Sequence, residues 1–263
     1  MIANVSRRAD RAAILAREAA HHDQLVAGSD PLAAPPGDPD WFEAALLGAA
    51  GPVTGLSVLD YGCGEGGLSL LLAQAGAARV TGVDISPATL AFAARRAQAF
   101  TPGADIDFVV ADAGATGLAA ESFDLVVGKF ILHHLDVVPA LREVRRLLKP
   151  GGRAVFIETS ALNPILRLAR RYIVHANRMG TAKFGTSDEH PLGLRDLRAV
   201  RQVFPGAVID FPTFWFWRVY ARNVKDWRSD AWNRRAHAWD GFVERRLRPL
   251  RPLSYYVRIS VGR

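Results

Sequence analysis

The stretch Val58-Leu-Asp-Tyr-Gly-Cys-Gly-Glu-Gly-Gly67 decides the fold, because it joins an apolar strand to a glycine-rich turn. Apolar residues lead to Asp60, and glycines follow at positions 62, 64, 66 and 67. Glycine suits a tight strand-to-helix turn that needs positive φ, or a backbone that must approach a ligand closely. The pattern therefore predicts a buried parallel strand that ends in a turn facing a nucleotide-like ligand.

Outward from this turn, candidate strands and helices alternate. The predicted strands cover residues 57–61, 79–84, 106–111, 123–128 and 153–158, and the predicted helices 67–75, 87–98 and 138–148. Such repeated βαβ units predict an α/β fold, with a parallel sheet that has helices on both faces. Ligands of these sheets bind at the carboxyl ends of the strands.

The flanks of this region read differently. An amphipathic helix is expected over residues 1–28, followed by a proline-rich linker over 28–40 and a second helix over 41–50. Beyond residue 158 we expect a helix at 194–203 and strands near 207–211 and 255–261. Between these strands lies an unusually aromatic segment, Phe211-Pro-Thr-Phe-Trp-Phe-Trp-Arg-Val-Tyr220. Dense aromatics form core by default, but here they can also line a pocket for an apolar acceptor.

Composition limits the classes of protein. The 263 residues are 49% hydrophobic and 22% charged, which is typical of a compact globular chain. A lone cysteine, Cys63, excludes an intramolecular disulfide and fits a cytoplasmic location, and no segment is apolar enough to predict a membrane span. The net charge of +7 comes from arginines scattered along the chain, so a base-composition bias of the source genome explains it better than a nucleic-acid partner. The basic 222–251 region leaves peripheral contact with a membrane open.

Three acids follow three neighbouring strands and indicate which ligand the turn holds. Asp60 would face a pyrophosphate with like charge, which argues against a dinucleotide and for a ligand with a cationic group. Asp84 can accept hydrogen bonds from both ribose hydroxyls, and Asp112 from an adenine amine. The three together predict an extended site for a nucleoside joined to an amino acid.

The same residues resemble the successive motifs of class I S-adenosylmethionine-dependent methyltransferases. The resemblance covers about residues 56–158 and rests on five segments: Asp60-Tyr-Gly-Cys-Gly-Glu-Gly66, Asp84, Asp112-Ala113, Phe123-Asp-Leu-Val-Val-Gly-Lys-Phe-Ile-Leu-His-His-Leu135 and Leu148-Lys-Pro-Gly-Gly152. It implies a doubly wound, mostly parallel seven-stranded sheet of the Rossmann-like methyltransferase type. Residues 1–52 would be a helical lid and linker, and residues 53–263 the cofactor-binding domain, with inserts at about 159–193 and 212–254 forming a helical and aromatic cap over the acceptor.

The resemblance also assigns cofactor-binding residues. S-adenosyl-L-methionine is the implied cofactor, and the residues implied to bind it are Asp60, Gly62, Gly64, Asp84, Ile85, Asp112, Ala113 and Lys129. Lys129 departs from the small or polar residue frequent at its position. Its ammonium would oppose the sulfonium, so only its backbone carbonyl is expected to serve the cofactor.

Catalytic candidates are histidines, because an imidazole near the methyl group can take the proton of a hydroxyl acceptor. His133 and His134 follow the fourth strand, where packing competes with catalysis as their role. His190 lies in Thr186-Ser-Asp-Glu-His190, which reads either as a helix cap or as part of the acceptor pocket. His21 and His22 sit either in a lid or on a solvated helix face. We expect no metal site.

The leading hypothesis is therefore methyl transfer to oxygen, nitrogen or carbon of a small, hydrophobic or aromatic metabolite. Two alternatives stay open: a non-methylating enzyme that uses the sulfonium for cyclisation or aminocarboxypropyl transfer, and an RNA methyltransferase. The released product discriminates the first, and a shared basic and aromatic face would be required by the second. The acceptor, the methylated atom and the oligomeric state do not follow from the sequence.

Overall fold

The computed structural model describes residues 2–33, 35, 37–169, 190–219 and 230–263. Its centre is a seven-stranded sheet in the order β3-β2-β1-β4-β5-β7-β6. The strands are β1 (Ser57–Tyr61), β2 (Arg79–Asp84), β3 (Ile106–Val110), β4 (Phe123–Lys129), β5 (Leu148–Thr159), β6 (Val208–Asp210) and β7 (Tyr256–Gly262). Strands β1 to β5 pair in parallel, whereas β7 is antiparallel to both of its neighbours. The predicted α/β fold with a mostly parallel seven-stranded sheet is confirmed.

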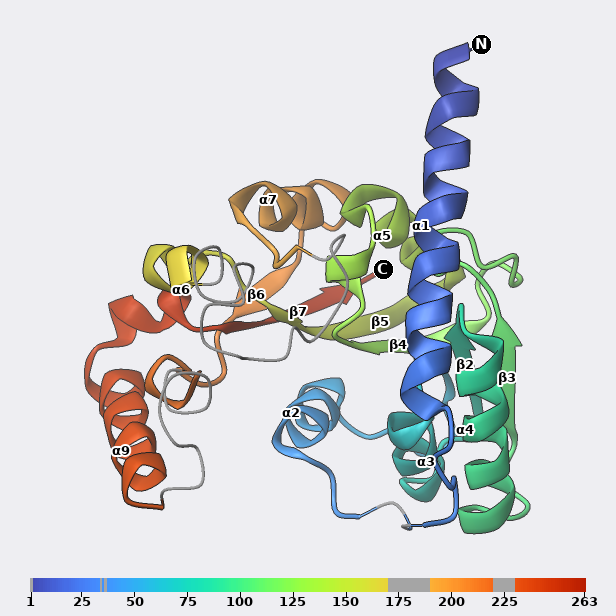
Figure 1. Cartoon of the computed structure of the whole chain (residues 1–263), viewed down its shortest axis with the longest axis horizontal. Helices are drawn as coiled ribbons and strands as arrows, with labels where there is room; N and C mark the ends of the chain where they lie inside the picture. The colour runs from blue at the N-terminus through green and yellow to red at the C-terminus, as the bar shows by residue number, and fades with distance from the viewer. Residues whose placement is uncertain (1, 34, 36, 170–189, 220–229) are drawn as a thin grey trace.

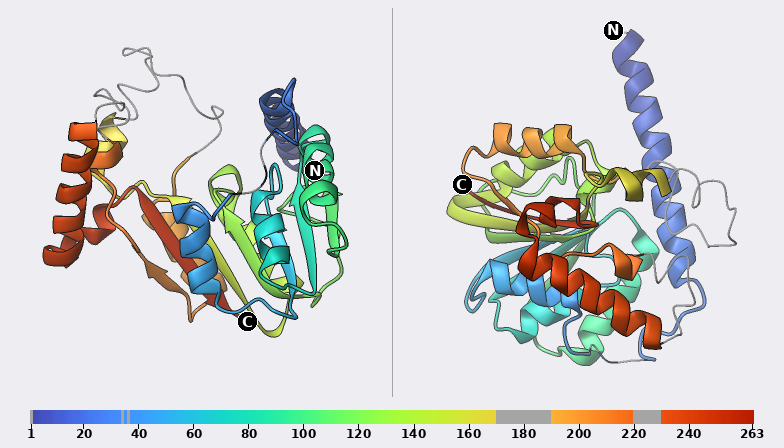
Figure 2. Two further views of the ribbon diagram at one scale, coloured as in Figure 1. Left: turned by 90° about the horizontal axis from the view of Figure 1, so that it is seen from below. Right: turned by 90° about the vertical axis from the view of Figure 1, so that its left-hand side faces the viewer.

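Helices cover both faces of the sheet (Figure 1). The described helices are α1 (Ile2–Val26), α2 (Trp41–Ala50), α3 (Gly67–Gln74), α4 (Pro87–Phe100), η1 (Leu132–His134), α5 (Val137–Leu147), α6 (Pro164–Ala169), α7 (Leu194–Val203), α9 (Asp230–Arg246) and η3 (Arg248–Leu253). Helices α5 and α7 lie on one face, and α2, α3 and α4 lie on the other. Figure 2 shows α9 and α1 at opposite ends of the sheet.

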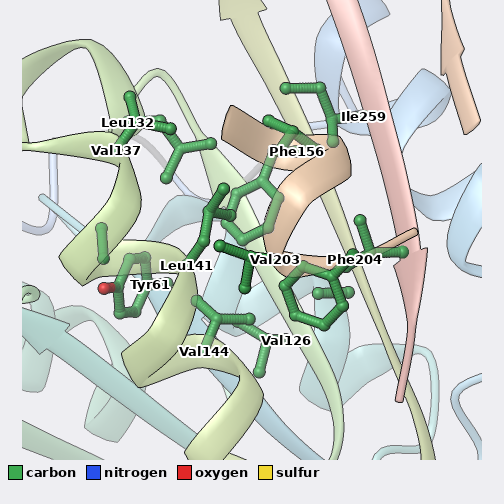
Figure 3. Packing of buried hydrophobic residues seen from close by; sticks show 14 of the residues in the cluster. Tyr61, Val126, Leu132, Val137, Leu141, Val144, Phe156, Val203, Phe204 and Ile259 are labelled. Carbon is green, nitrogen blue, oxygen red and sulfur yellow. The ribbon is translucent and has the colours of Figure 1, made fainter. Parts of the chain in front are cut away.

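Alternation along β1 divides its side chains between the two faces. Leu59 and Tyr61 join the core beneath α5 and α7, and Val58 joins the core beneath α2 and α3. Figure 3 shows the first of these cores, where Leu141 of α5 packs close to Phe156. Asp60 therefore points to the same face as α3, at the carboxyl end of the strand. The fold thus carries this acid to the edge where a ligand binds.

The predicted lid and linker, residues 1–52, contains two helices with different surroundings. Leu46 and Ala50 of α2 are buried against the sheet, so α2 is part of the core. Helix α1 instead packs beside α4, where Asp23 accepts a hydrogen bond from Ser86 Oγ at 2.6 Å. Its N-terminal half projects beyond the rest of the chain in Figure 1. None of the described helices combines the length and apolarity needed to cross a bilayer.

The structure departs from the predicted boundaries in the second half. Strand β5 begins at Leu148, five residues before the predicted start at residue 153, and so includes Gly151 and Gly152. It pairs with Phe123, with a shift in register before Leu125. Most of the predicted insert at 159–193, including the Thr186 to Glu189 capping pattern, lies outside the described residues, as does the 220–229 part of the second insert.

Candidate functional site

The glycine turn after β1 has the backbone that its sequence predicts. Gly62, Gly64 and Gly66 all have positive φ, at 78°, 49° and 76°. A Cβ at Gly62 would lie 2.6 Å from Cδ1 of Ile131, a distance that no ordinary side-chain contact reaches. Gly62 therefore has to be glycine for two reasons, backbone conformation and space, and the turn brings its amide groups to the edge of the sheet.

Asp60 is the buried acid of the site. Its carboxylate is 1% exposed and accepts a hydrogen bond from Ser69 Oγ of α3 at 2.6 Å. Burial raises the pKa of Asp60 to about 6, against the lowering effect of the Ser69 hydrogen bond. A buried carboxylate of this kind gains from a positively charged ligand, as the sequence indicates.

Asp84 ends β2 and organises the same turn. Oδ2 accepts from the Gly64 amide and Oδ1 from the Ser86 amide, both at 3.0 Å. Since a carboxylate offers about four lone-pair positions, it keeps capacity for ribose hydroxyls.

Asp112 has a partner that the sequence did not reveal. Its Oδ2 accepts from Arg11 of α1, at 2.7 Å from Nη2 and 3.1 Å from Nε, and its Oδ1 accepts from the Gly114 amide at 2.8 Å. The predicted adenine-reading acid is thus already held by the N-terminal helix.

Lys129 lies at the end of β4, and its ammonium is close to two acids at the start of α2, the N-cap residue Asp40 and Glu43. Nζ forms ion pairs with Glu43 and, at 3.4 Å, with Asp40. The same two acids close the capping box at the start of α2. Because these carboxylates balance the ammonium, Lys129 need not oppose a sulfonium in the neighbouring cavity.

Three cavities adjoin at the carboxyl edge of the sheet. The large cavity holds about 520 Å³ and is lined by His22, Leu25, Val26, Glu43, Asp60, Gly62, Cys63, Gly64, Glu65, Gly67, Leu68, Asp84, Thr89, Lys129, Phe130, Ile131, His133 and His134. The narrow cavity, beneath α1, is lined by Ile14, Leu15, Glu18, His22, Gly62, Val83, Asp84, Ile85, Ala111, Ala113, Ile131, His134 and Leu135. A third cavity of about 350 Å³ is lined by Ile14, His134, Leu135, Asp136, Val137, Val138, His190, Asp196 and Ala199. His134 lines all three.

The adjacent histidines that the sequence singles out have different surroundings. Nδ1 of His133 lies 2.8 Å from Oε2 of Glu158, which is fully buried. The other oxygen of Glu158 accepts from the amides of Ile131 and Leu132, at 2.8 and 2.7 Å. Glu158 thus joins the His133 ring to the backbone at the start of η1. The sequence analysis did not single out Glu158. An acid near the end of an apolar strand could have indicated a buried, paired carboxylate, because acids are rarely buried without a partner.

His134 faces helix α1 instead. Its Nδ1 lies 3.1 Å from Oε2 of Glu18, and its ring centroid lies 6.1 Å from that of His22. His190 is exposed, its amide donates to the carbonyl of His133 at 3.2 Å, and the residue lines the third cavity. The structure therefore gathers His22, His134 and His190 around the cavities.

Trp215 of the aromatic segment packs with aromatic side chains from other parts of the chain. Trp215 and Tyr256 pack with Trp41, Phe42 and Phe130, with ring centroids 4.7–6.0 Å apart. We call these five side chains the aromatic cluster. Phe130 belongs to both the cluster and the large cavity, and it has positive φ at 61°, which is unusual for a bulky residue.

Asp124 serves the opposite end of the sheet. It accepts from the Ser57 amide at 2.9 Å and from Lys149 Nζ at 2.8 Å, and the Lys149 hydrogen bond lowers its pKa. Asp124 therefore has a structural role, linking the starts of β1 and β5.

A glycine turn beneath the edge of a parallel sheet, with acids at the ends of β1 and β2, defines a nucleoside-cofactor site. Comparison with known proteins agrees. Residues 59–156 match the family model described as a methyltransferase domain. A ubiquinone biosynthesis O-methyltransferase from Cereibacter sphaeroides is 33% identical over 190 residues, which cover 68% of this chain and 73% of the relative.

Two further similarities are more limited. A 2-phytyl-1,4-naphtoquinone methyltransferase from Thermosynechococcus vestitus is 37% identical over 124 residues, 46% of this chain and 50% of the relative. The geranyl diphosphate C-methyltransferase of Streptomyces coelicolor A3(2) shares the fold, with a TM-score of 0.57 and 20% identity over 84% of this chain and 78% of that one. The chain belongs to the class I S-adenosylmethionine-dependent methyltransferases, and S-adenosylmethionine is its cofactor.

Proposed function

We propose that the enzyme methylates a small hydrophobic or aromatic acceptor, with the cofactor extending from the large cavity into the narrow one. Asp84 lines both cavities, which suits a ribose between the methionine and adenine groups. Asp60 lies on the methionine side, where the cofactor is cationic. Ile85 and Ala113 line the narrow cavity and would pack against adenine.

The observation that carries the acceptor site is the position of His134 where the three cavities adjoin. We place the reacting atom of the acceptor beside His134, with His190 lining the third cavity beyond it. His133 is better suited to positioning this turn, because its Nδ1 is engaged by Glu158. The main catalytic effect would be alignment of the acceptor behind an already activated methyl group.

The aromatic cluster favours an apolar acceptor. Phe130 brings the cluster to the wall of the large cavity, and Leu25 and Val26 of α1 add apolar surface there. The names of two relatives refer to ubiquinone biosynthesis and to a naphthoquinone, which supports an aromatic or quinone-like ring as the acceptor.

Electrostatics disfavour a nucleic-acid acceptor. The large cavity is lined by the acids Glu43, Asp60, Glu65 and Asp84, and Lys129, its lysine, is paired with acids. Such a wall repels phosphates, which dominate nucleic-acid affinity. The lone cysteine, Cys63, fits a reducing compartment, and we propose a cytoplasmic location.

Calorimetric titration with S-adenosylmethionine and S-adenosylhomocysteine, with NAD as control, tests the cofactor site. Acceptors are then screened among hydroxylated aromatics that carry an apolar chain, with mass spectrometry of the released nucleoside. S-adenosylhomocysteine is expected. Release of methylthioadenosine would instead show aminocarboxypropyl transfer, and methylation of RNA but of no small molecule would overturn the acceptor class.

A further inference from the structure

Three metal-ligating side chains from two separate elements meet at the wall of the site. Glu18 and His22 come from α1, and His134 comes from η1. One donor atom of each residue lies within 4.8 Å of the other two. Residues 18 and 22 are one helical turn apart on the same face, a spacing that suits two ligands to one ion.

Burial distinguishes this group from an ordinary surface cluster. Glu18 is 4% exposed, and a buried carboxylate requires compensation by a positive charge. Its Oε2 lies 3.1 Å from Nδ1 of His134. In a tetrahedral site with bonds of about 2.0–2.1 Å, neighbouring ligand atoms are about 3.3 Å apart. The Glu18 and His134 atoms are already near that separation.

The field around the group is also suited to a cation. Asp84 lines the narrow cavity together with Glu18, His22 and His134, and Asp60 and Glu43 line the adjoining large cavity. Because His22 and His134 line both cavities, an ion held between them would face the space where cofactor and acceptor meet.

We propose that Glu18, His22 and His134 bind one first-row divalent cation. Two imidazoles and one carboxylate are the ligands of open metal sites, in which the remaining positions belong to water or substrate. The ion ties helix α1 to the turn after β4, and so holds the N-terminal helix closed over the cofactor.

The open position suggests a chemical role, which rests on the proposed function. An acceptor hydroxyl bound to the ion loses its proton to solvent more readily, because coordination lowers the pKa of a bound hydroxyl. The resulting oxygen attacks the methyl carbon, the carbon–sulfur bond breaks, and its electron pair stays on sulfur to give neutral S-adenosylhomocysteine. The ion is unchanged, and no oxidant or reductant is needed.

The test uses the full chain, treated with chelator and then titrated with Zn²⁺ by calorimetry and with Co²⁺ by visible absorption. We expect one equivalent of each ion to bind, and bound Co²⁺ should absorb more strongly in the visible range than the hydrated ion, because nitrogen and oxygen ligands at low coordination number replace the octahedral water shell. His22→Ala and His134→Ala should each bind at least about tenfold more weakly. His21→Ala, which removes the neighbouring imidazole, is the matched control and should bind normally.

Circular dichroism and urea denaturation check that each variant is folded, since His22 and His134 line the cofactor cavities and their loss can also change cofactor binding. Unchanged Zn²⁺ affinity in folded His22→Ala and His134→Ala would overturn the proposal, as would no binding by the wild-type chain, which would leave Glu18 and His134 as an ion pair only. Metal binding without methyl transfer to any acceptor would contradict the proposed function and not the site. Methyl transfer that persists at full rate in chelator, with no metal bound, would contradict the role of the ion in the reaction and leave the proposed function standing.

Discussion

Arg11 and Asp112 are joined across the site, with the guanidinium Nη2 of the N-terminal helix 2.7 Å from the carboxylate Oδ2 of the loop after β3. Ile14 and Leu15, one turn further along α1, cover the narrow cavity. The ion pair therefore holds α1 over the place proposed for adenine.

Arg11→Ala is expected to speed the release of S-adenosylhomocysteine by about two- to fivefold, because partly exposed ion pairs contribute about 0.2–1 kcal/mol. Stopped-flow displacement measures the rate, and Arg95→Ala, an exposed arginine of α4, is the control. Slower release would show that Arg11 competes with adenine for Asp112.

Asp84→Ala should weaken binding of S-adenosylmethionine by about 10- to 150-fold, since hydrogen bonds to a charged group contribute about 1.5–3 kcal/mol. It also removes the acceptor of the Gly64 and Ser86 amides. Asp107→Ala, on exposed strand surface, serves as control in the same calorimetric assay. Equal affinity in the two variants would remove Asp84 from the cofactor site.

Asp60 should make stability and binding depend on pH with opposite signs. Burial raises the pKa of Asp60 from 3.8 to about 6, so its contribution to stability is full below pH 3.8 and is lost as the pH rises through about 6. This difference in pKa corresponds to about 3 kcal/mol. Asp60→Asn, which stays neutral and can still accept from Ser69, should therefore resist urea better than wild type above pH 6, and equally well near pH 4.

Binding of the cationic cofactor should follow the opposite course, because it favours the carboxylate. Affinity of the wild type for S-adenosylmethionine should fall by up to about tenfold per pH unit below about pH 6. In Asp60→Asn this pH dependence should disappear and the affinity be low throughout. A wild-type profile that is flat between pH 5 and 7 would contradict the assignment.

Gly62→Ala should abolish cofactor binding. It should also lower the free energy of unfolding by more than the cost of placing alanine at a positive φ, because the new Cβ would clash with Ile131. Gly103 has a similar φ, 83°, but a Cβ there would meet no atom within 4 Å, so Gly103→Ala measures the cost of the conformation, about 1–2 kcal/mol. The excess cost at Gly62 reports the clash with Ile131. Equal unfolding free energies for the two variants would show that Ile131 moves aside freely.

Glu158→Ala should lower the free energy of unfolding by about 3–5 kcal/mol, because it strands the amides of Ile131 and Leu132 and the ring of His133 in the core. Glu158→Gln, which retains one acceptor oxygen, should cost less. Urea denaturation compares both with Glu121→Gln at the surface. A cost near zero for Glu158→Ala would mean that the η1 turn holds without it.

The parts of the site that the sequence predicted are local. The strand, the glycine turn and Asp60 lie within ten residues, and Asp84 follows from the end of the next strand. Short-range backbone chemistry decides such features, so a pattern of residue types is sufficient to find them.

Contacts between distant segments escaped prediction. Nothing in the residues near Asp112 indicates that Arg11 contacts it. Nor does the sequence indicate that Glu18 and His22 lie next to His134, and we expected no metal site. Likewise, the aromatic segment was expected to form a cap, but Phe42 and Tyr256, from other parts of the chain, complete its cluster. Helix packing and strand order decide these pairs, and a single sequence does not specify them.

The sheet order also bears on how the protein is made. The five parallel strands, β1 to β5, lie next to one another in the sheet and are complete in sequence at residue 159. Strand β6 instead pairs only with β7, which begins at Tyr256. During synthesis, which proceeds from the N-terminus, β6 is made nearly fifty residues before the strand with which it pairs. All residues that line the large and the narrow cavity therefore belong to the part of the chain that is made before β5, and the half of the sheet that carries Tyr256 is completed only after that part has been synthesised.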